Sequence, residues 1–183
     1  IRISCKNYWM MSRMSKFKLI LSPGAKDTML LIPGWATDYR IFDAIKINYN
    51  YLLPVEFSPF IFCDDLVKAM KAGGIKKISV LGWSMGGFVA CDLVSEYRDL
   101  INEVIFVGVR PRYEKVNNEK IKTFLIRNRK TFLHKFYDDC ISVDSDAYKW
   151  FCAHLLSDYL ESMELGYLLE ELDYLSGHQI DPK

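Results

Sequence analysis

The segment from Val80 to Ala90, VLGWSMGGFVA, constrains the fold of this chain more than any other stretch. It begins in an apolar run that is typical of a strand buried on both faces. Glycines and a serine follow, and the sequence then continues with the apolar spacing of a helix. The small residues allow a sharp turn and close approach of backbone segments. The segment therefore predicts a buried strand that turns directly into a helix.

Similar patterns on both sides of this segment extend the alternation of strands and helices. We expect strands at residues 16–21 (an edge strand), 28–32, 50–53, 78–82 and 103–109, the last also buried, and helices at 61–70 and 86–97. The first of these helices should end at Gly73-Gly74. This order of elements predicts an α/β fold, with a mostly parallel sheet covered on both faces.

The composition changes at Pro111, from which charged and aromatic residues continue with helical periodicity to about Gly177. We expect residues 15–110 to form the sheet core, 111–177 an inserted helical lid, and 178–183 the start of a return to the core. No strand pattern follows the lid, so we expect the last strands to be missing through C-terminal truncation. Residues 1–14 are expected to be a disordered or non-native extension. Position 1 is not a methionine, and Met10, Met11 or Met14 could be the true start of translation.

The predicted lid separates its charges along the chain. Basic residues dominate positions 110–135, and acidic residues dominate 138–173. The simpler interpretation is that two helical stretches present solvated and mutually attractive faces. The sharper interpretation is a docking face for an acidic carrier protein or substrate, formed by Arg110, Arg112, Lys122, Arg127, Arg129 and Lys130.

Composition limits the classes of partner and compartment. The 183 residues include 24 Lys and Arg against 23 Asp and Glu, so no net field favours nucleic acid or an anionic membrane. No apolar stretch approaches the length of a spanning helix. The five cysteines are scattered without metal-ligand spacing, which indicates reduced thiols in a cytoplasmic protein. We expect neither a metal nor another cofactor.

Gly82-Trp83-Ser84-Met85-Gly86 fits the pattern G-x-S-x-G, in which a strand-to-helix turn exposes a nucleophilic serine. Gly82, Gly86 and the following Gly87 would make that turn possible. Serine also needs donors for the oxyanion that forms during attack, and the backbone N–H of Met85 at the helix start is one candidate. The alternative is an ordinary glycine-rich turn in which the serine caps the helix.

A second oxyanion donor is expected from the loop that follows residues 28–32. Gly34 there permits close backbone approach, and the N–H of Trp35 would be the donor. Considered without Ser84, the same loop is equally consistent with a turn that ends a strand and packs a tryptophan.

Together, LLIPGWATDYRIFD and ISVLGWSMGGFVA resemble the α/β-hydrolase fold superfamily. Within it, GWATD and GWSMGG are similar to the pimeloyl-acyl-carrier-protein methyl ester esterases of biotin synthesis. The resemblance implies a carboxylesterase with Ser84 as nucleophile, Trp35 and Met85 amides as oxyanion hole, and a helical cap over an acyl pocket. It also implies a carrier-bound acyl methyl ester as substrate. The sequence departs from the family at Pro33 and in PVEFSPF, residues 54–60, which we interpret as a loop.

The acid and the histidine that would complete a triad follow the serine in this fold. His134 and His154 fall within the predicted lid, and no strand precedes His178. We therefore expect the triad partners to lie beyond Lys183. Two other functions remain open: a non-catalytic or incomplete binding domain on the hydrolase scaffold, and a related acyltransferase.

Overall fold

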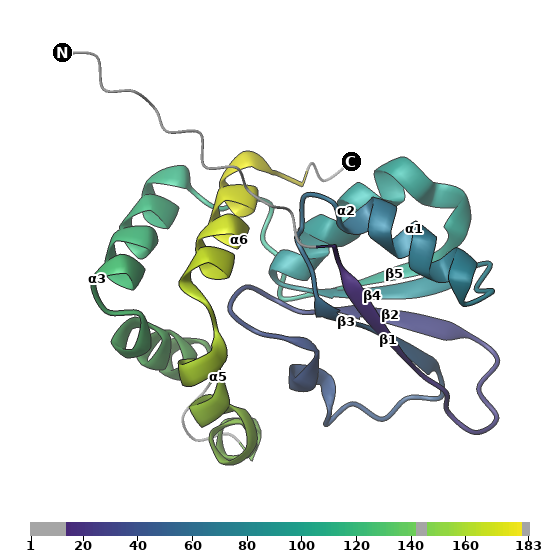
Figure 1. Cartoon of the computed structure of the whole chain (residues 1–183), viewed down its shortest axis with the longest axis horizontal. Coiled ribbons are helices and arrows are strands. Elements are labelled where there is room, and N and C mark those ends of the chain that lie inside the picture. The colour runs from purple at the N-terminus through teal and green to yellow at the C-terminus, as the bar shows by residue number, and fades with distance from the viewer. Residues whose placement is uncertain (1–13, 142–145, 181–183) are drawn as a thin grey trace.

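The computed structural model describes residues 14–141 and 146–180. Five strands form one sheet in the order β1-β3-β2-β4-β5 (Figure 1). Their bounds are Lys16–Ile20 for β1, Thr28–Ile32 for β2, Asn50–Glu56 for β3, Ile78–Trp83 for β4 and Ile101–Val107 for β5. β1 is antiparallel to β3, and the other pairs are parallel. The predicted α/β fold with a mostly parallel sheet is confirmed.

Alternate residues of the central strands face two different clusters. Leu30 and Ile32 of β2 belong to the main core, which includes buried residues of α1 (Phe62–Ala72) and α2 (Met85–Tyr97). Met29 and Leu31 belong to a smaller cluster with Phe42 from the short helix η1 (Tyr39–Phe42). A second short helix, η2 (Arg98–Leu100), leads into β5. This alternation is the two-residue period of a strand buried on both faces.

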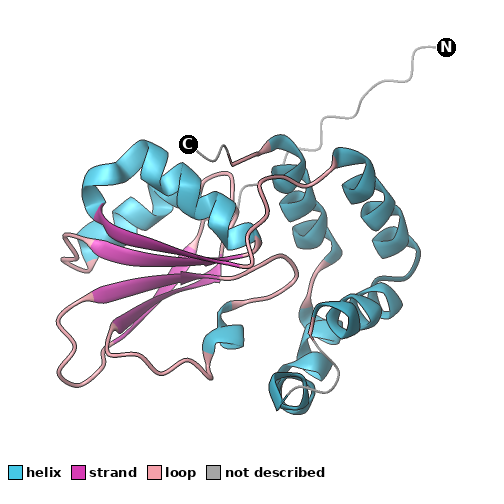
Figure 2. Ribbon diagram, turned by 180° about the vertical axis from the view of Figure 1, so that it is seen from behind, coloured by secondary structure: helices cyan, strands magenta, loops and turns pink. Residues whose placement is uncertain are grey.

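The remaining helices form a separate layer beside the sheet (Figures 1 and 2). They are α3 (Lys115–Cys140), α4 (Asp146–Phe151), a π-helical turn η3 (Cys152–Leu156), α5 (Ser157–Ser162) and α6 (Leu165–Gly177). Because the sequence predicts a lid in this part of the chain, we call them the lid helices. Asn128 has non-helical dihedral angles and kinks α3, while its side-chain oxygen accepts a hydrogen bond from Thr131 N at 3.1 Å.

The two ends of the helical layer meet. Ile180 N donates to Pro111 O at 2.7 Å, and Arg112 forms an isolated β-bridge with Gln179. The chain thus enters and leaves the helical layer at neighbouring points. The predictions for residues 1–13 and 181–183 lie outside the described residues.

Two sequence predictions are wrong in detail. The segment 103–109 was expected to be a buried strand, but Ile105, Phe106 and Val107 are 40%, 49% and 42% exposed. In the described structure β5 lies at the sheet edge and pairs only with β4, so these side chains are not enclosed. The segment 54–60 was expected to be a loop, but β3 continues through Glu56.

Pro54 is tolerated in β3 because of where it lies. The pairing of β3 with β2 ends at Leu52, so Pro54 has no partner on that side and its missing N–H breaks no bond there. On the other side it faces Phe17, next to a register irregularity in β1.

Within the described ranges, no helix is both long enough and apolar enough to cross a membrane. The four cysteines in those ranges, Cys63, Cys91, Cys140 and Cys152, are free thiols.

Candidate active site

Ser84 occupies the turn between β4 and α2. Its backbone lies at φ 52° and ψ −113°, a region that costs a non-glycine residue about 1–3 kcal/mol and persists only where the surroundings enforce it. Ser84 N donates to Val107 O of the neighbouring strand at 2.9 Å, and Gly87 N donates to Ser84 O at 3.0 Å. The sheet edge and the helix start therefore hold this strained turn in place.

The three glycines of the turn occupy positions where a side chain would collide. A Cβ on Gly82 would lie 2.6 Å from Gly86 O. On Gly86 it would overlap the carbonyl oxygen of Ile32, and on Gly87 it would overlap the side chain of Val109. These close approaches explain why small residues surround Ser84 in this sequence.

The loop after β2 passes directly beside Ser84. Because it contains Trp35, whose N–H is a predicted oxyanion donor, we call residues 33–38 the oxyanion loop. A Cβ on Gly34 would lie 3.3 Å from the Cβ of Ser84. Trp35 N–H makes no hydrogen bond within the described ranges. Met85 is the first residue of α2, so its N–H has no acceptor one turn earlier in the helix. Both predicted donors thus have hydrogen-bonding capacity to spare.

A cavity of about 460 Å³ is bounded by the serine turn, the oxyanion loop, α3 and α6. Aromatic residues contribute much of its wall: Trp35, Trp83, Tyr113, Phe136 and Tyr137. The hydroxyl of Tyr113 lies 3.2 Å from Ser84 Oγ, and its ring packs against Phe88. A cavity of this size and lining suits an apolar group of moderate size next to Ser84.

None of the three histidines lines this cavity. His134 Nδ1 lies 3.0 Å from Asp138 on the exposed side of α3, and His154 stacks on Trp150. His178 Nε2 lies 3.6 Å from Asp92, while its Nδ1 contacts Tyr174 O at 2.7 Å. Within the described residues, the structure therefore brings no histidine to the serine.

The six cations of the proposed docking face are placed differently from one another. Lys122 pairs with Asp173 and Glu119, Lys130 pairs with Glu161, and Arg112 pairs with Glu114. Arg129 donates to the backbone carbonyls of Leu160, Glu161 and Met163 at the end of α5. Arg110 lines the cavity, and Arg127 is exposed. Two of these ion pairs, those of Lys122 with Asp173 and Lys130 with Glu161, link the basic stretch to the acidic one.

Sequence reasoning missed Glu171, a fully buried carboxyl on α6. Its Oε2 accepts a hydrogen bond from Ala36 N in the oxyanion loop at 3.3 Å. Burial raises the pKa of Glu171 to about 8, although hydrogen bonds from Tyr167 and Ala36 N oppose the rise. A signal was present in the sequence, because Glu171 shares the helical face of Leu168, Leu172 and Leu175.

Comparison with known proteins places this chain in a family. A model described as alpha/beta hydrolase fold matches residues 25–154. None of the curated protein sequences gives a significant match.

Solved structures similar to this chain include an esterase, EaEST, from Exiguobacterium antarcticum, with 13% identity and a TM-score of 0.76 over 91% of this chain and 70% of that one. A bromoperoxidase from Bacillus anthracis has 18% identity and a TM-score of 0.71 over 90% and 70%. An enol-lactonase from Burkholderia xenovorans LB400 has 12% identity and a TM-score of 0.72 over 92% and 73%. At sequence identities of 12–18%, these matches show similarity of fold alone. With the family model matching most of its length, this chain belongs to the alpha/beta hydrolase fold family.

Proposed function

We propose that this protein is a serine hydrolase that cleaves carboxylic esters through an acyl-enzyme on Ser84. The observation that carries the proposal is the strained turn at Ser84, which lies beside two backbone N–H groups with spare hydrogen-bonding capacity. Two structures of similar fold are described as an esterase and an enol-lactonase, which supports ester chemistry by analogy.

In the proposed reaction, Ser84 Oγ attacks the ester carbonyl carbon as its proton is removed. The N–H groups of Trp35 and Met85 stabilise the negative charge on the carbonyl oxygen. The bond to the alcohol breaks, the alcohol takes up the proton, and the acyl group remains on Ser84. Water then attacks the acyl carbonyl, which releases the acid and returns a proton to Ser84 Oγ.

The scheme assigns the roles of nucleophile and oxyanion donors to residues that lie within the described structure. None of the three histidines lines the cavity at its described position, which supports a proton acceptor other than these histidines. Tyr113 supplies a hydroxyl contact to Ser84 Oγ, which orients the serine in the resting state. The aromatic lining of the cavity favours an ester with an apolar acyl group.

A carrier-bound acyl methyl ester, as in biotin synthesis, is the narrower form of this proposal. Arg129 is bound to backbone carbonyls, so Arg110 at the cavity and the exposed Arg127 are the docking candidates with neither an ion pair nor a hydrogen bond in the described structure. Because Arg110 also lines the cavity, the comparison is relative: replacing both with glutamine should lower turnover of an ester on acyl carrier protein about tenfold more than turnover of a small free ester. Equal losses on both substrates would refute carrier docking.

The test of the main proposal is hydrolysis of p-nitrophenyl butyrate by the wild type, Ser84→Ala and Ser95→Ala. Ser95 is exposed on α2, away from the turn, and is the matched control. We expect Ser84→Ala to lower kcat at least about 1,000-fold and Ser95→Ala to match the wild type. Folded wild-type protein that neither turns over nor acylates would instead favour a non-catalytic binding domain. Transfer of the butyryl group to an added alcohol in preference to water would indicate an acyltransferase.

A further inference from the structure

The oxyanion loop is held by the lid helices. Trp35 Nε1 donates to Leu168 O of α6 at 3.0 Å, and Ala36 N donates to Glu171 Oε2 of the same helix at 3.3 Å. Tyr137 of α3 donates its hydroxyl hydrogen to Ala36 O at 2.6 Å. All three hydrogen bonds are buried, so water does not compete for them.

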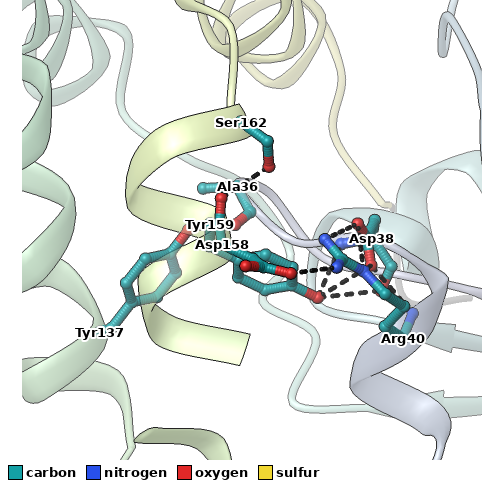
Figure 3. A network of polar contacts seen from close by, with 7 residues as sticks. All are labelled: Ala36, Asp38, Arg40, Tyr137, Asp158, Tyr159 and Ser162. Atoms are coloured by element: carbon teal, nitrogen blue, oxygen red, sulfur yellow. Dashed lines mark hydrogen bonds and ion pairs between the residues drawn. The ribbon is translucent and has the colours of Figure 1, made fainter. Parts of the chain in front are cut away.

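The far end of the loop is also bound to the lid (Figure 3). Tyr159 donates its hydroxyl hydrogen to Asp38 Oδ1 at 3.0 Å, and Arg40 bridges Asp38 and Asp158 at 2.9 and 3.0 Å. Figure 3 shows Tyr137 and Tyr159 reaching the loop from the lid side. The loop is therefore attached to the lid at both Ala36 and Asp38.

The loop needs such support because its backbone is strained. Ala36 lies at φ 59°, a left-handed conformation that an alanine rarely adopts. Glu171 accepts from the N–H of Ala36, which belongs to the peptide group that joins Trp35 and Ala36. Tyr137 donates to the carbonyl of Ala36, which belongs to the next peptide group. Together these contacts fix the orientation of the chain immediately after Trp35.

Glu171 is the unexpected member of this set. Its helix face is otherwise apolar, with Leu168, Leu172 and Leu175 all buried. The carboxyl has no ion pair with a cation in the described structure, and Glu171 is not among the residues that line the Ser84 cavity. A leucine would fill this position at lower electrostatic cost, so the carboxyl must be explained by its polar contacts. One is with Tyr167 on the same helix, and the other, which reaches the oxyanion loop, is with the N–H of Ala36.

We propose that Glu171 is a positioning residue for the oxyanion hole: by holding Ala36 N–H it sets the direction in which Trp35 N–H points at the reacting carbonyl oxygen. The inference rests on the proposed function, since Trp35 N–H matters only if Ser84 attacks an ester. It makes the lid a part of the catalytic machinery as well as a cover for the acyl group.

The test compares Glu171→Leu, Glu171→Gln and Glu170→Leu. Glutamine keeps an oxygen that accepts from Ala36 N, whereas leucine removes it. Glu170 is the matched control because it also links α6 to the core, through the hydroxyl of Ser58, but does not contact the oxyanion loop. All assays are run at a temperature where circular dichroism shows each variant folded.

For p-nitrophenyl butyrate we expect Glu171→Leu to lower kcat by about 10- to 100-fold with KM changed less than about threefold, since a misplaced donor weakens transition-state binding selectively. The kcat of Glu171→Gln should lie within about threefold of the wild-type value, and so should the kcat of Glu170→Leu. The inference is overturned if folded Glu171→Leu keeps the wild-type kcat, or if leucine and glutamine lower it equally.

A readout that does not need catalysis separates this inference from the proposed function. Hydrogen exchange of the Ala36 amide, followed by NMR, should accelerate at least tenfold in Glu171→Leu and remain slow in Glu171→Gln, Glu170→Leu and Ser84→Ala. Unchanged exchange in Glu171→Leu would show that Glu171 does not hold the oxyanion loop, whether or not the protein hydrolyses esters. Accelerated exchange in a protein without esterase activity would support the hold and refute the proposed function.

Discussion

The Ser84 turn and the oxyanion loop lie side by side but are held in different ways. The turn is fixed by backbone contacts from neighbouring parts of the sheet, such as Val107 O, and by the absence of side chains at its glycines. The loop is fixed by residues more than a hundred positions later, since Ala36 is 101 residues from Tyr137 and 135 from Glu171. The proposed nucleophile thus depends on the sheet, and one of its proposed oxyanion donors depends on the lid helices.

This difference implies that the two parts of the site can be damaged separately. A change in the turn should disturb the core on which the whole fold depends. A change at the contact between lid and loop should leave a folded sheet with a poorly aligned donor. Substitutions in each part therefore test that separation.

Gly86→Ala should be the most damaging single change. The added methyl group would overlap Ile32 O and lie 2.8 Å from Pro33 O, both backbone atoms that cannot move aside cheaply. We expect a loss of about 4 kcal/mol or more in the free energy of unfolding, or no folded protein at all. Gly166→Ala is the control, because nothing lies within 4 Å of a Cβ there. A Gly86→Ala variant as stable as Gly166→Ala in urea denaturation would contradict the described packing.

The buried carboxyl on the lid side should give a pH dependence of stability. Folded Glu171 keeps its proton up to a pKa of about 8, whereas the unfolded chain releases it near 4.5. The folded state therefore binds more protons between these values, so the free energy of unfolding falls as pH rises. Between pH 5.5 and 7.5, urea titrations should show the wild type losing roughly 2 kcal/mol relative to Glu171→Gln. A parallel pH dependence in both proteins would mean that Glu171 titrates normally.

Tyr137→Phe should weaken the contact between lid and loop without disturbing the Ser84 turn. It leaves the buried carbonyl of Ala36 without its donor, and we expect a loss of about 1–3 kcal/mol in thermal unfolding. The control is Tyr97→Phe, which removes an exposed hydrogen bond to Asp64 and should cost less than about 0.5 kcal/mol. Equal losses would indicate that the Tyr137 hydroxyl contributes no more than a surface contact.

The surface ion pairs of the lid should matter least. Lys130 and Glu161 are paired at 2.6 Å, but their side chains are 53% and 67% exposed. Lys130→Met should therefore change the free energy of unfolding by no more than about 0.5 kcal/mol, and less still at 1 M NaCl. A loss above 1 kcal/mol that persists in high salt would show that this pair helps to hold the lid.

The sequence was informative where structure is decided locally. VLGWSMGGFVA combines a strand pattern, a glycine-rich turn and a helix pattern within a few residues, and each is realised close to its predicted place. A local pattern does not predict which residues from distant parts of the chain will pack around a side chain. Glu171 sits in an acidic stretch that suggests solvent exposure, and only its alignment with buried leucines indicated otherwise.

The wrong predictions have the same origin. The apolar run of β5 predicts burial, yet exposure depends on whether another element covers the strand, and Ile105 to Val107 are uncovered in the described structure. Pro54 predicts the end of a strand, yet a proline is acceptable beyond the last pairing with β2. Neighbours across the fold, which no local pattern specifies, decided both outcomes.

The most direct test of the central claim is mass-spectrometric mapping of the wild-type protein after reaction with a fluorophosphonate. The proposed function predicts one adduct per chain, on the peptide that contains Ser84, absent from Ser84→Ala and retained in Ser95→Ala. It should form more slowly in Glu171→Leu. An adduct on a different residue, or folded wild-type protein that forms none, would contradict the assignment of Ser84 as the nucleophile.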